Sequence, residues 1–288
     1  MMAGAGWRVG RVDVVPVHET DAGTVIQSGI AEARPEALAG EARLVPDFAD
    51  RSGRMLAVTQ AFVVRVGGST ILVDTCVGNH KPRPGLPAWS GMATDFLQRL
   101  SLAGVEPGDV DVVVCTHLHF DHVGWNTVLV DGAWVPLFVN ARHLICRAEF
   151  EHWSRFPERE SADDLAGVRD SVLPVVEAGL VDLVAADHVI HPEVRLFPSH
   201  GHTPGHVSVL IESAGERALI SGDAIHHPCQ IAQTAWGIFS DFDPKLAHAT
   251  RRELLGYCAD SGALLIGTHF PPPTAVTVRR EGRGFAIG

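Results

Sequence analysis

The run His117-Leu118-His119-Phe120-Asp121-His122 places three imidazoles and a carboxylate within a few residues. It follows Asp111–Cys115, an apolar, β-branched run typical of a strand that is covered on both faces. In extended backbone, residues two apart face the same side, so His117 and His119 can bind one ion. Asp121 and His122 come after the chain bends and can face a second ion. Imidazole and carboxylate ligands together suit Zn²⁺, and also Fe²⁺, Mn²⁺ or Co²⁺.

Three more residues of metal-binding type stand where apolar strand runs end. They are His202 after Val194–Phe197, Asp223 after Ala218–Ser221, and His269 after Ala263–Ile266. Strand ends commonly carry the sites of α/β proteins, because a rigid scaffold holds the loops there. Asp223 has two carboxylate oxygens and could bridge two ions. The four strand ends together predict a dinuclear metal site.

The elements that must position these residues form two β-rich halves with helices between and after them. Gly67-Gly68 joins two β-rich runs as a hairpin turn. Residues 140–180 look mainly helical. Asp243-Pro244 supplies an N-cap and a first-turn proline for a helix that runs to about Ala259.

This order of elements predicts the α/β class, as an αββα sandwich of two mixed β-sheets with helices on the outer faces. No linker separates independent domains, so residues 1–288 are expected to form a single domain. Residues 1–55 are expected to contribute to the substrate pocket or to an oligomer contact, and a homodimer is one open arrangement.

The composition of the chain argues against several classes of binding partner. The formal net charge is −11, which argues against nucleic acid and anionic membranes, since both need a basic surface. The five cysteines lack CxxC spacing, and their number is odd, so neither a disulfide framework nor a zinc ribbon fits. Without a signal peptide or a long apolar stretch, the chain is expected to be cytoplasmic and soluble.

Four motifs in order, THLHFDHVGWN, GHTPGH, SGDA and GTH, resemble the signature motifs of the metallo-β-lactamase-fold hydrolase superfamily. The resemblance implies that His117, His119 and His202 bind one metal and that Asp121, His122 and His269 bind the other, with Asp223 bridging. It also implies that Asp74 orients a ligand from outside the coordination sphere. His206, in GHTPGH, is expected to support its loop rather than to bind metal.

Two further segments, GDAIHHP and GTHFPPPTAVTVRREGRGFAI, resemble the stand-alone lactonases and the related methyl-parathion-hydrolase type. One departure matters: the quorum-quenching lactonases typically carry a tyrosine three residues past the bridging aspartate, and this chain carries His226. The expected function is therefore hydrolysis of a lactone or other uncharged ester. Phosphotriester hydrolysis, hydrolytic dehalogenation and a non-hydrolytic, iron- or metal-binding role are the alternatives.

The expected mechanism uses a metal-bridging hydroxide, because two divalent ions, most simply zinc, lower the pKa of bound water. Asp121 would orient the nucleophile and later carry a proton to the leaving group, and His226 would stabilise the oxyanion or act as acid. An uncharged substrate suits an apolar pocket. The candidate lining residues are Phe120, Trp125, Trp153, Phe156 and Phe270, with Trp125 expected at an exposed rim.

Overall fold

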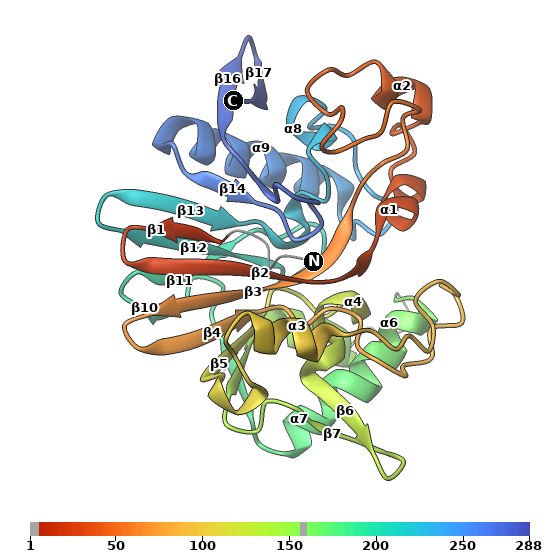
Figure 1. Ribbon diagram of the computed structural model, residues 1–288, viewed down its shortest axis with the longest axis vertical. Helices are drawn as coiled ribbons and strands as arrows, with labels where there is room; N and C mark the ends of the chain where they lie inside the picture. Colours follow the sequence, from red (N-terminus) through yellow and green to blue (C-terminus); the bar gives the residue numbers. More distant parts are fainter. Residues whose placement is uncertain (1–5, 156–159) are drawn as a thin grey trace. The chain divides into compact units, whose positions relative to one another are not determined.

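The computed structural model describes residues 6–155 and 160–288, and Phe156 lies outside this range. The chain forms two compact units, each built from two stretches of sequence. The first unit comprises Met1–Thr20 and Thr59–Ala186, and the second comprises Asp21–Val58 and Asp187–Gly288. Figure 1 shows the strands and helices, most of them labelled.

The first unit is built on a seven-stranded mixed sheet in the order β1-β2-β3-β4-β5-β8-β9. The pairs β1–β2 and β3–β4 are antiparallel, whereas β4–β5, β5–β8 and β8–β9 are parallel. Gly67 and Gly68 both have positive φ in the β3–β4 turn, as the predicted hairpin requires. The strand bounds are Trp7–Val9, Val12–Asp21, Val58–Val66, Ser69–Val73, Val112–Cys115, Arg142–Cys146 and Val181–Val184.

Short helices connect these strands. They are α3 (Phe96–Leu102), α4 (Phe120–Val123), α5 (Arg147–Arg155), α6 (Ala162–Gly167) and α7 (Leu173–Glu177), with a π-helical turn at Val168–Val172. A separate hairpin joins β6 (Thr127–Val130) to β7 (Ala133–Pro136). The apolar core of this unit gathers buried residues of β3, β4, β5 and β8 against α3, including Phe96 and Leu100.

The second unit is built on a six-stranded mixed sheet in the order β10-β11-β12-β13-β14-β15. Only β13 and β14 run parallel; the other neighbours are antiparallel. The strand bounds are Val189–His191, Val194–Pro198, Val207–Ser213, Glu216–Ile220, Leu264–Ile266 and Ala275–Val276. The remaining elements are α1 (Gly23–Gly29), α2 (Pro35–Ala39), α8 (Cys229–Ala232), α9 (Pro244–Ser261) and the hairpin of β16 (Val278–Glu281) and β17 (Gly284–Ile287).

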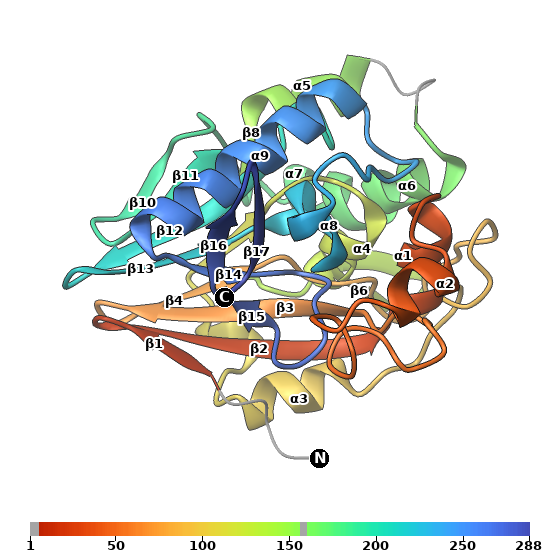
Figure 2. The same ribbon diagram turned by 90° about the horizontal axis from the view of Figure 1, so that it is seen from above.

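Helix α9 begins and ends where its sequence predicts. Asp243 accepts hydrogen bonds from the backbone of Lys245 and Leu246, Pro244 occupies the first turn, and Gly262 closes the helix at φ 71°. The helix lies beside the β16–β17 hairpin (Figure 2). Its N-terminal turn also contacts the turn that carries His202, because Asp243 donates its backbone N–H to the carbonyl of Gly201.

The predicted α/β class with two mixed sheets is confirmed. The mainly helical reading of residues 140–180 is partly wrong, because Arg142–Cys146 is a strand. Four of its five residues are buried between β5 and β9, and this burial favours the extended form. Within the described residues, no helix is both long and apolar enough to cross a membrane.

Candidate functional site

Three imidazoles of the HLHFDH run lie together in the first unit. His117 follows β5 through Thr116, and His119 stands directly before α4, which contains Asp121 and His122. The Nε2 atom of His117 lies 3.0 Å from Nδ1 of His119, and the ring centroids of His117 and His122 are 4.1 Å apart. Asp121 Oδ2 lies 3.7 Å from His122 Nε2. The three rings are buried, so this cluster concentrates nitrogen ligands where water has little access.

Asp74, at the end of β4, fixes this cluster from behind. Its Oδ2 accepts hydrogen bonds from His122 Nδ1 (2.9 Å) and Thr116 Oγ1 (2.9 Å), and its Oδ1 accepts the Thr116 N–H (2.8 Å). The residue is buried and has φ 58°, a strained value for a residue with a side chain. Because an ionised carboxylate only accepts, the proton of a neutral His122 sits on Nδ1, and Nε2 carries the lone pair that a metal needs.

Two carboxylates that sequence reasoning missed hold the motif in place. Glu149 Oε1 accepts the Leu118 N–H at 3.1 Å and the Trp153 indole N–H at 2.8 Å. The Trp153 ring in turn meets the His119 ring edge-on at 5.8 Å, so this predicted pocket residue packs directly on a candidate ligand. Asp164 Oδ1 accepts the Phe120 N–H at 3.3 Å. Neither carboxylate follows a recognisable motif, which is why spacing alone does not reveal them.

The expectation of an exposed rim for Trp125 is wrong. Its side chain is 4% exposed and stacks on Phe96 in the apolar core, with ring centroids 5.3 Å apart. The indole N–H donates to Glu19 Oε1 at 2.5 Å, and Glu19 also accepts from the backbone of Val77 and Gly78. Burial raises the pKa of Glu19, although these hydrogen bonds oppose the rise. Because the indole N–H finds its hydrogen-bond acceptor inside the unit, the ring can be buried.

Asp223 is the centre of the corresponding cluster in the second unit. It lies in the 3₁₀ turn Gly222–Ala224 that follows β13. Three imidazoles surround its carboxylate: His226 Nε2 at 3.2 Å, His269 Nε2 at 3.2 Å and His202 Nε2 at 3.5 Å. All four side chains are buried, so the strand ends of this sheet do converge on one aspartate.

Two of these imidazoles are fixed through their other nitrogen. His202 Nδ1 lies 3.0 Å from Asp241 Oδ1, and His269 Nδ1 lies 2.8 Å from the carbonyl oxygen of Val58. Both partners are acceptors, so both rings direct Nε2 toward Asp223. Asp241 was not predicted, because it is far from His202 in the sequence and belongs to no motif.

His226 differs from its neighbours. Within the described part of the chain, neither of its ring nitrogens makes a hydrogen bond, although Nε2 is close to Asp223. Its backbone is held instead, because the His226 N–H donates to Gln230 Oε1 at 2.7 Å. Its ring therefore lacks the second-nitrogen acceptor that usually orients a metal ligand.

Two further histidines near the cluster, His206 and His227, have structural partners. His206 accepts the Asp223 N–H at Nε2 (2.9 Å), and its Nδ1 lies 2.8 Å from Ser199 Oγ. His227 Nε2 donates to the carbonyl of Phe48 (2.9 Å), and its Nδ1 accepts the Cys229 N–H (3.1 Å). Burial lowers the pKa of His227 to about 4, against the raising effect of the Phe48 hydrogen bond, so it is neutral near pH 7.

The remaining predicted lining residues lie in packed surroundings. Phe120 meets Trp89 edge-on at 6.0 Å in the first unit, and Phe270 is fully buried against Phe48 at 6.4 Å in the second. Phe156 lies outside the described residues.

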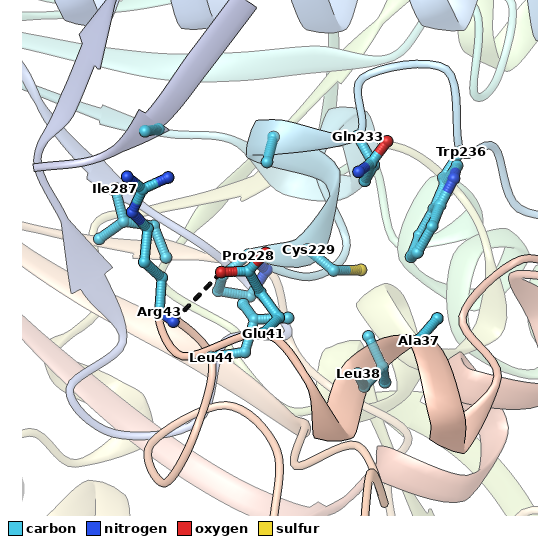
Figure 3. A pocket seen from close by; sticks show the side chains of 12 residues that line it. Ala37, Leu38, Glu41, Arg43, Leu44, Pro228, Cys229, Gln233, Trp236 and Ile287 are labelled. Atoms are coloured by element: carbon cyan, nitrogen blue, oxygen red, sulfur yellow. Dashed lines mark hydrogen bonds between the residues drawn. The ribbon is translucent and has the colours of Figure 1, made fainter. Parts of the chain in front are cut away.

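A pocket of the second unit is lined from both of its sequence stretches (Figure 3). Leu38 and Leu44 come from the N-terminal stretch, and Pro228, Cys229 and Trp236 come from the segment directly after His226 and His227. Residues of the N-terminal stretch therefore line one wall of this pocket, next to α8. Their part in a substrate pocket or an oligomer contact stays a prediction.

The donor sets fit metal ions. Histidines that bind metals almost always donate their second ring N–H to a carboxylate or a backbone carbonyl. His122, His202 and His269 each have such a partner, in Asp74, Asp241 and the Val58 carbonyl. Imidazole nitrogens with two nearby aspartates are a borderline donor set, which suits zinc and its neighbours in the first transition row.

Comparison with known proteins gives the following likenesses. Residues 56–269 of this chain match the family model of the metallo-beta-lactamase superfamily. An N-acyl homoserine lactonase from Bacillus sp is 33% identical over 114 residues, which cover 40% of this chain and 38% of the relative. One from Bacillus thuringiensis is 29% identical over 156 residues, 54% of each chain. The chain thus spans about half or less of the length of these curated relatives.

Solved structures match over almost the whole chain. The hydrolase AbOPH in the beta lactamase superfamily has TM-score 0.81 at 24% identity and covers 100% of this chain and 97% of its own. AidC, a dizinc quorum-quenching lactonase solved with the product N-hexnoyl-L-homoserine, has TM-score 0.78 at 20% identity. The match covers 99% of this chain and 97% of AidC. These likenesses show that the chain shares the fold of both proteins.

Proposed function

The chain belongs to the metallo-beta-lactamase superfamily, and on this premise we propose that it is a metal-dependent hydrolase of lactones or other uncharged esters. One observation carries the proposal most. The candidate ligands His122, His202 and His269 are each oriented by an acceptor on Nδ1. Buried imidazoles whose second ring nitrogen is held by an acceptor are typical of metal ligands.

The motifs of the superfamily assign the ligands. By this resemblance, His117, His119 and His202 would hold one ion, Asp121, His122 and His269 would hold the other, and Asp223 would be the ligand that both share. Two features support the assignment: the close grouping of the HLHFDH imidazoles, and the surrounding of Asp223 by Nε2 atoms. Zinc is the proposed metal, since the donors suit it and a likeness to a dizinc lactonase agrees with that choice.

Two divalent ions, when bound, would lower the pKa of a coordinated water and polarise the substrate carbonyl. The chain itself would supply the proton transfers. The side chain of Asp121 is 12% exposed, against 5% for Asp223, so Asp121 is the better placed to carry a proton to a leaving alkoxide. His226, unanchored at its ring, would donate a hydrogen bond to the substrate oxygen as negative charge develops there.

Turnover of a chromogenic lactone by zinc-loaded protein tests the proposal. We expect Asp223→Ala to abolish turnover and to reduce the zinc content. His226→Ala should retain zinc but turn over more slowly, by about 10²-fold if it acts as acid. His188→Ala, a half-buried histidine outside both clusters, is the matched control and should behave as wild type. Undiminished turnover after complete metal removal would refute the proposal.

Phosphotriester hydrolysis is the second candidate function. It is favoured by His226, which stands where the quorum-quenching lactonases typically carry tyrosine and where phosphotriesterase-like relatives tend to carry histidine. A panel of lactones, aryl esters, phosphotriesters and haloaromatics, run with defined metals, ranks these activities by kcat/KM. An absorption spectrum with metal analysis separates a non-hydrolytic iron protein from all of them.

A further inference from the structure

Arg251 is a fully buried arginine on α9 that no sequence motif singles out. Its side chain is 1% exposed. Its Nε donates to the carbonyl of Ala224 at 3.0 Å, and its Nη1 donates to the carbonyls of Thr234 (2.9 Å) and Trp236 (3.1 Å). One guanidinium therefore ties together both ends of the segment 224–236.

Each of these attachments leads to a residue of the Asp223 cluster. Ala224 is the residue directly after Asp223. The Trp236 carbonyl also accepts from Gln230 Nε2 at 2.8 Å, and the Oε1 atom of that glutamine holds the backbone of His226. Arg251 thus restrains the backbone next to the bridging aspartate and, through Gln230, the backbone of His226.

A third attachment leads to His202. Arg251 Nη2 lies 3.7 Å from Asp241 Oδ2, and Asp241 Oδ1 lies 3.0 Å from His202 Nδ1. Asp241 also accepts the Ile238 N–H at 3.2 Å, so its carboxylate is held between the arginine, its own loop and the imidazole.

Stability alone is a poor reason for this arrangement. A buried charge pair loses much of its Coulomb energy to desolvation, and apolar replacements are often neutral or stabilising. The Arg251 Nη2 atom is buried and makes no hydrogen bond among the described residues, which adds to that desolvation cost. The planar, multi-donor fork of an arginine instead suits the simultaneous orientation of several acceptors.

We propose that Arg251 is a positioning residue that sets the geometry of Asp223, His202 and His226 through the segment 224–241. The inference rests on the proposed function for its consequence, since these three residues matter most when a metal is bound. It does not depend on which substrate is hydrolysed.

Two variants of Arg251 and one control test the proposal on the full chain. Arg251→Lys keeps the charge but offers a single nitrogen, which cannot reach three carbonyls and a carboxylate together. Arg251→Met removes the charge at similar length. Leu255→Ala, at a fully buried position on the same helix that makes none of the Arg251 hydrogen bonds, is the control for general destabilisation.

The first measurement is amide hydrogen exchange of the metal-free protein. We expect faster exchange at Ile238 and His226 in both Arg251 variants and unchanged exchange there in Leu255→Ala. The second measurement is chelator competition with zinc and the visible spectrum of the cobalt-substituted protein. Both Arg251 variants should bind zinc about 10- to 100-fold more weakly and show an altered cobalt spectrum. Leu255→Ala should match wild type in both readouts.

The outcomes separate the two proposals. If wild type binds zinc and both Arg251 variants keep its exchange pattern, zinc affinity and cobalt spectrum, the positioning role is overturned and the hydrolase proposal stands. If wild type binds no metal, the hydrolase proposal fails, and the exchange measurement still decides whether Arg251 orders the segment. If Leu255→Ala lost as much exchange protection and zinc affinity as the Arg251 variants, the arginine would have only a general stabilising role, and the inference would be overturned.

Discussion

We predict that His143, on β8 of the first unit, makes the protein sensitive to acid for a reason unrelated to metal binding. The side chain is fully buried, and neither ring nitrogen makes a hydrogen bond within the described chain. Burial lowers the pKa of His143 to about 4, from an ordinary value of 6.5, with the backbone of Ala141 acting in the opposite direction. His143→Leu removes this titrating group and puts an apolar side chain of similar size in its place.

The magnitude follows from the two pKa values. Between pH 6.5 and pH 4, the unfolded chain binds a proton at His143 and the folded chain does not, so the free energy of unfolding falls with falling pH. The pKa difference of about 2.5 corresponds to roughly 3 kcal/mol at 1.36 kcal/mol per unit. Above about pH 6.5, His143 does not lower the free energy of unfolding. As the pH falls from 6.5 toward 4, protonation of His143 in the unfolded chain lowers it by an amount that grows to the full value.

Urea unfolding of the metal-free protein at a series of pH values between 7.5 and 4 is the assay. Wild type should lose roughly 3 kcal/mol more than His143→Leu over this range, whereas His188→Leu should follow wild type. Metal-free protein is used so that protonation of the candidate ligands cannot contribute through metal loss. Parallel curves of unfolding free energy against pH for wild type and His143→Leu would contradict this prediction.

Three further predictions concern the candidate site and its supports. Asp74→Ala removes the acceptor that fixes an imidazole, and zinc affinity by chelator competition should fall about 10- to 100-fold. Trp125→Phe leaves Glu19 without its indole donor, and urea unfolding should show a loss of about 2 kcal/mol; no loss would contradict the buried hydrogen bond. Gly201→Ala should lower stability by at least about 1 kcal/mol, because φ is 128° and the new Cβ would lie 2.3 Å from the Ala247 nitrogen.

The candidate ligands could be predicted because each follows an apolar strand, and that pattern is local in the sequence. The partners that orient them could not. Asp241 lies 39 residues from His202, and the Val58 carbonyl lies 211 residues from His269. Every residue type carries a backbone carbonyl, so no sequence pattern identifies the residue whose carbonyl accepts the hydrogen bond.

The errors have a similar origin. Trp125 closely follows the metal motif in the sequence, but it is buried because its indole N–H donates to Glu19 on β2. Arg142–Cys146 has the spacing of a helix, and its extended form is decided by the neighbouring strands β5 and β9. In each case a distant partner outweighs local preference.

The hydrogen bond between His269 and Val58 has a consequence for synthesis on the ribosome. Residues 21–58 belong to the second unit, but the rest of that unit begins only at residue 187. The N-terminal stretch must therefore wait, during translation, for well over a hundred residues before its structural partners exist. His269 is made 211 residues after Val58, and its Nδ1 meets this acceptor only when the two segments come together. We expect nascent chains released before residue 269 to be unable to bind metal as the full chain does, so that metal capture marks the end of folding rather than its start.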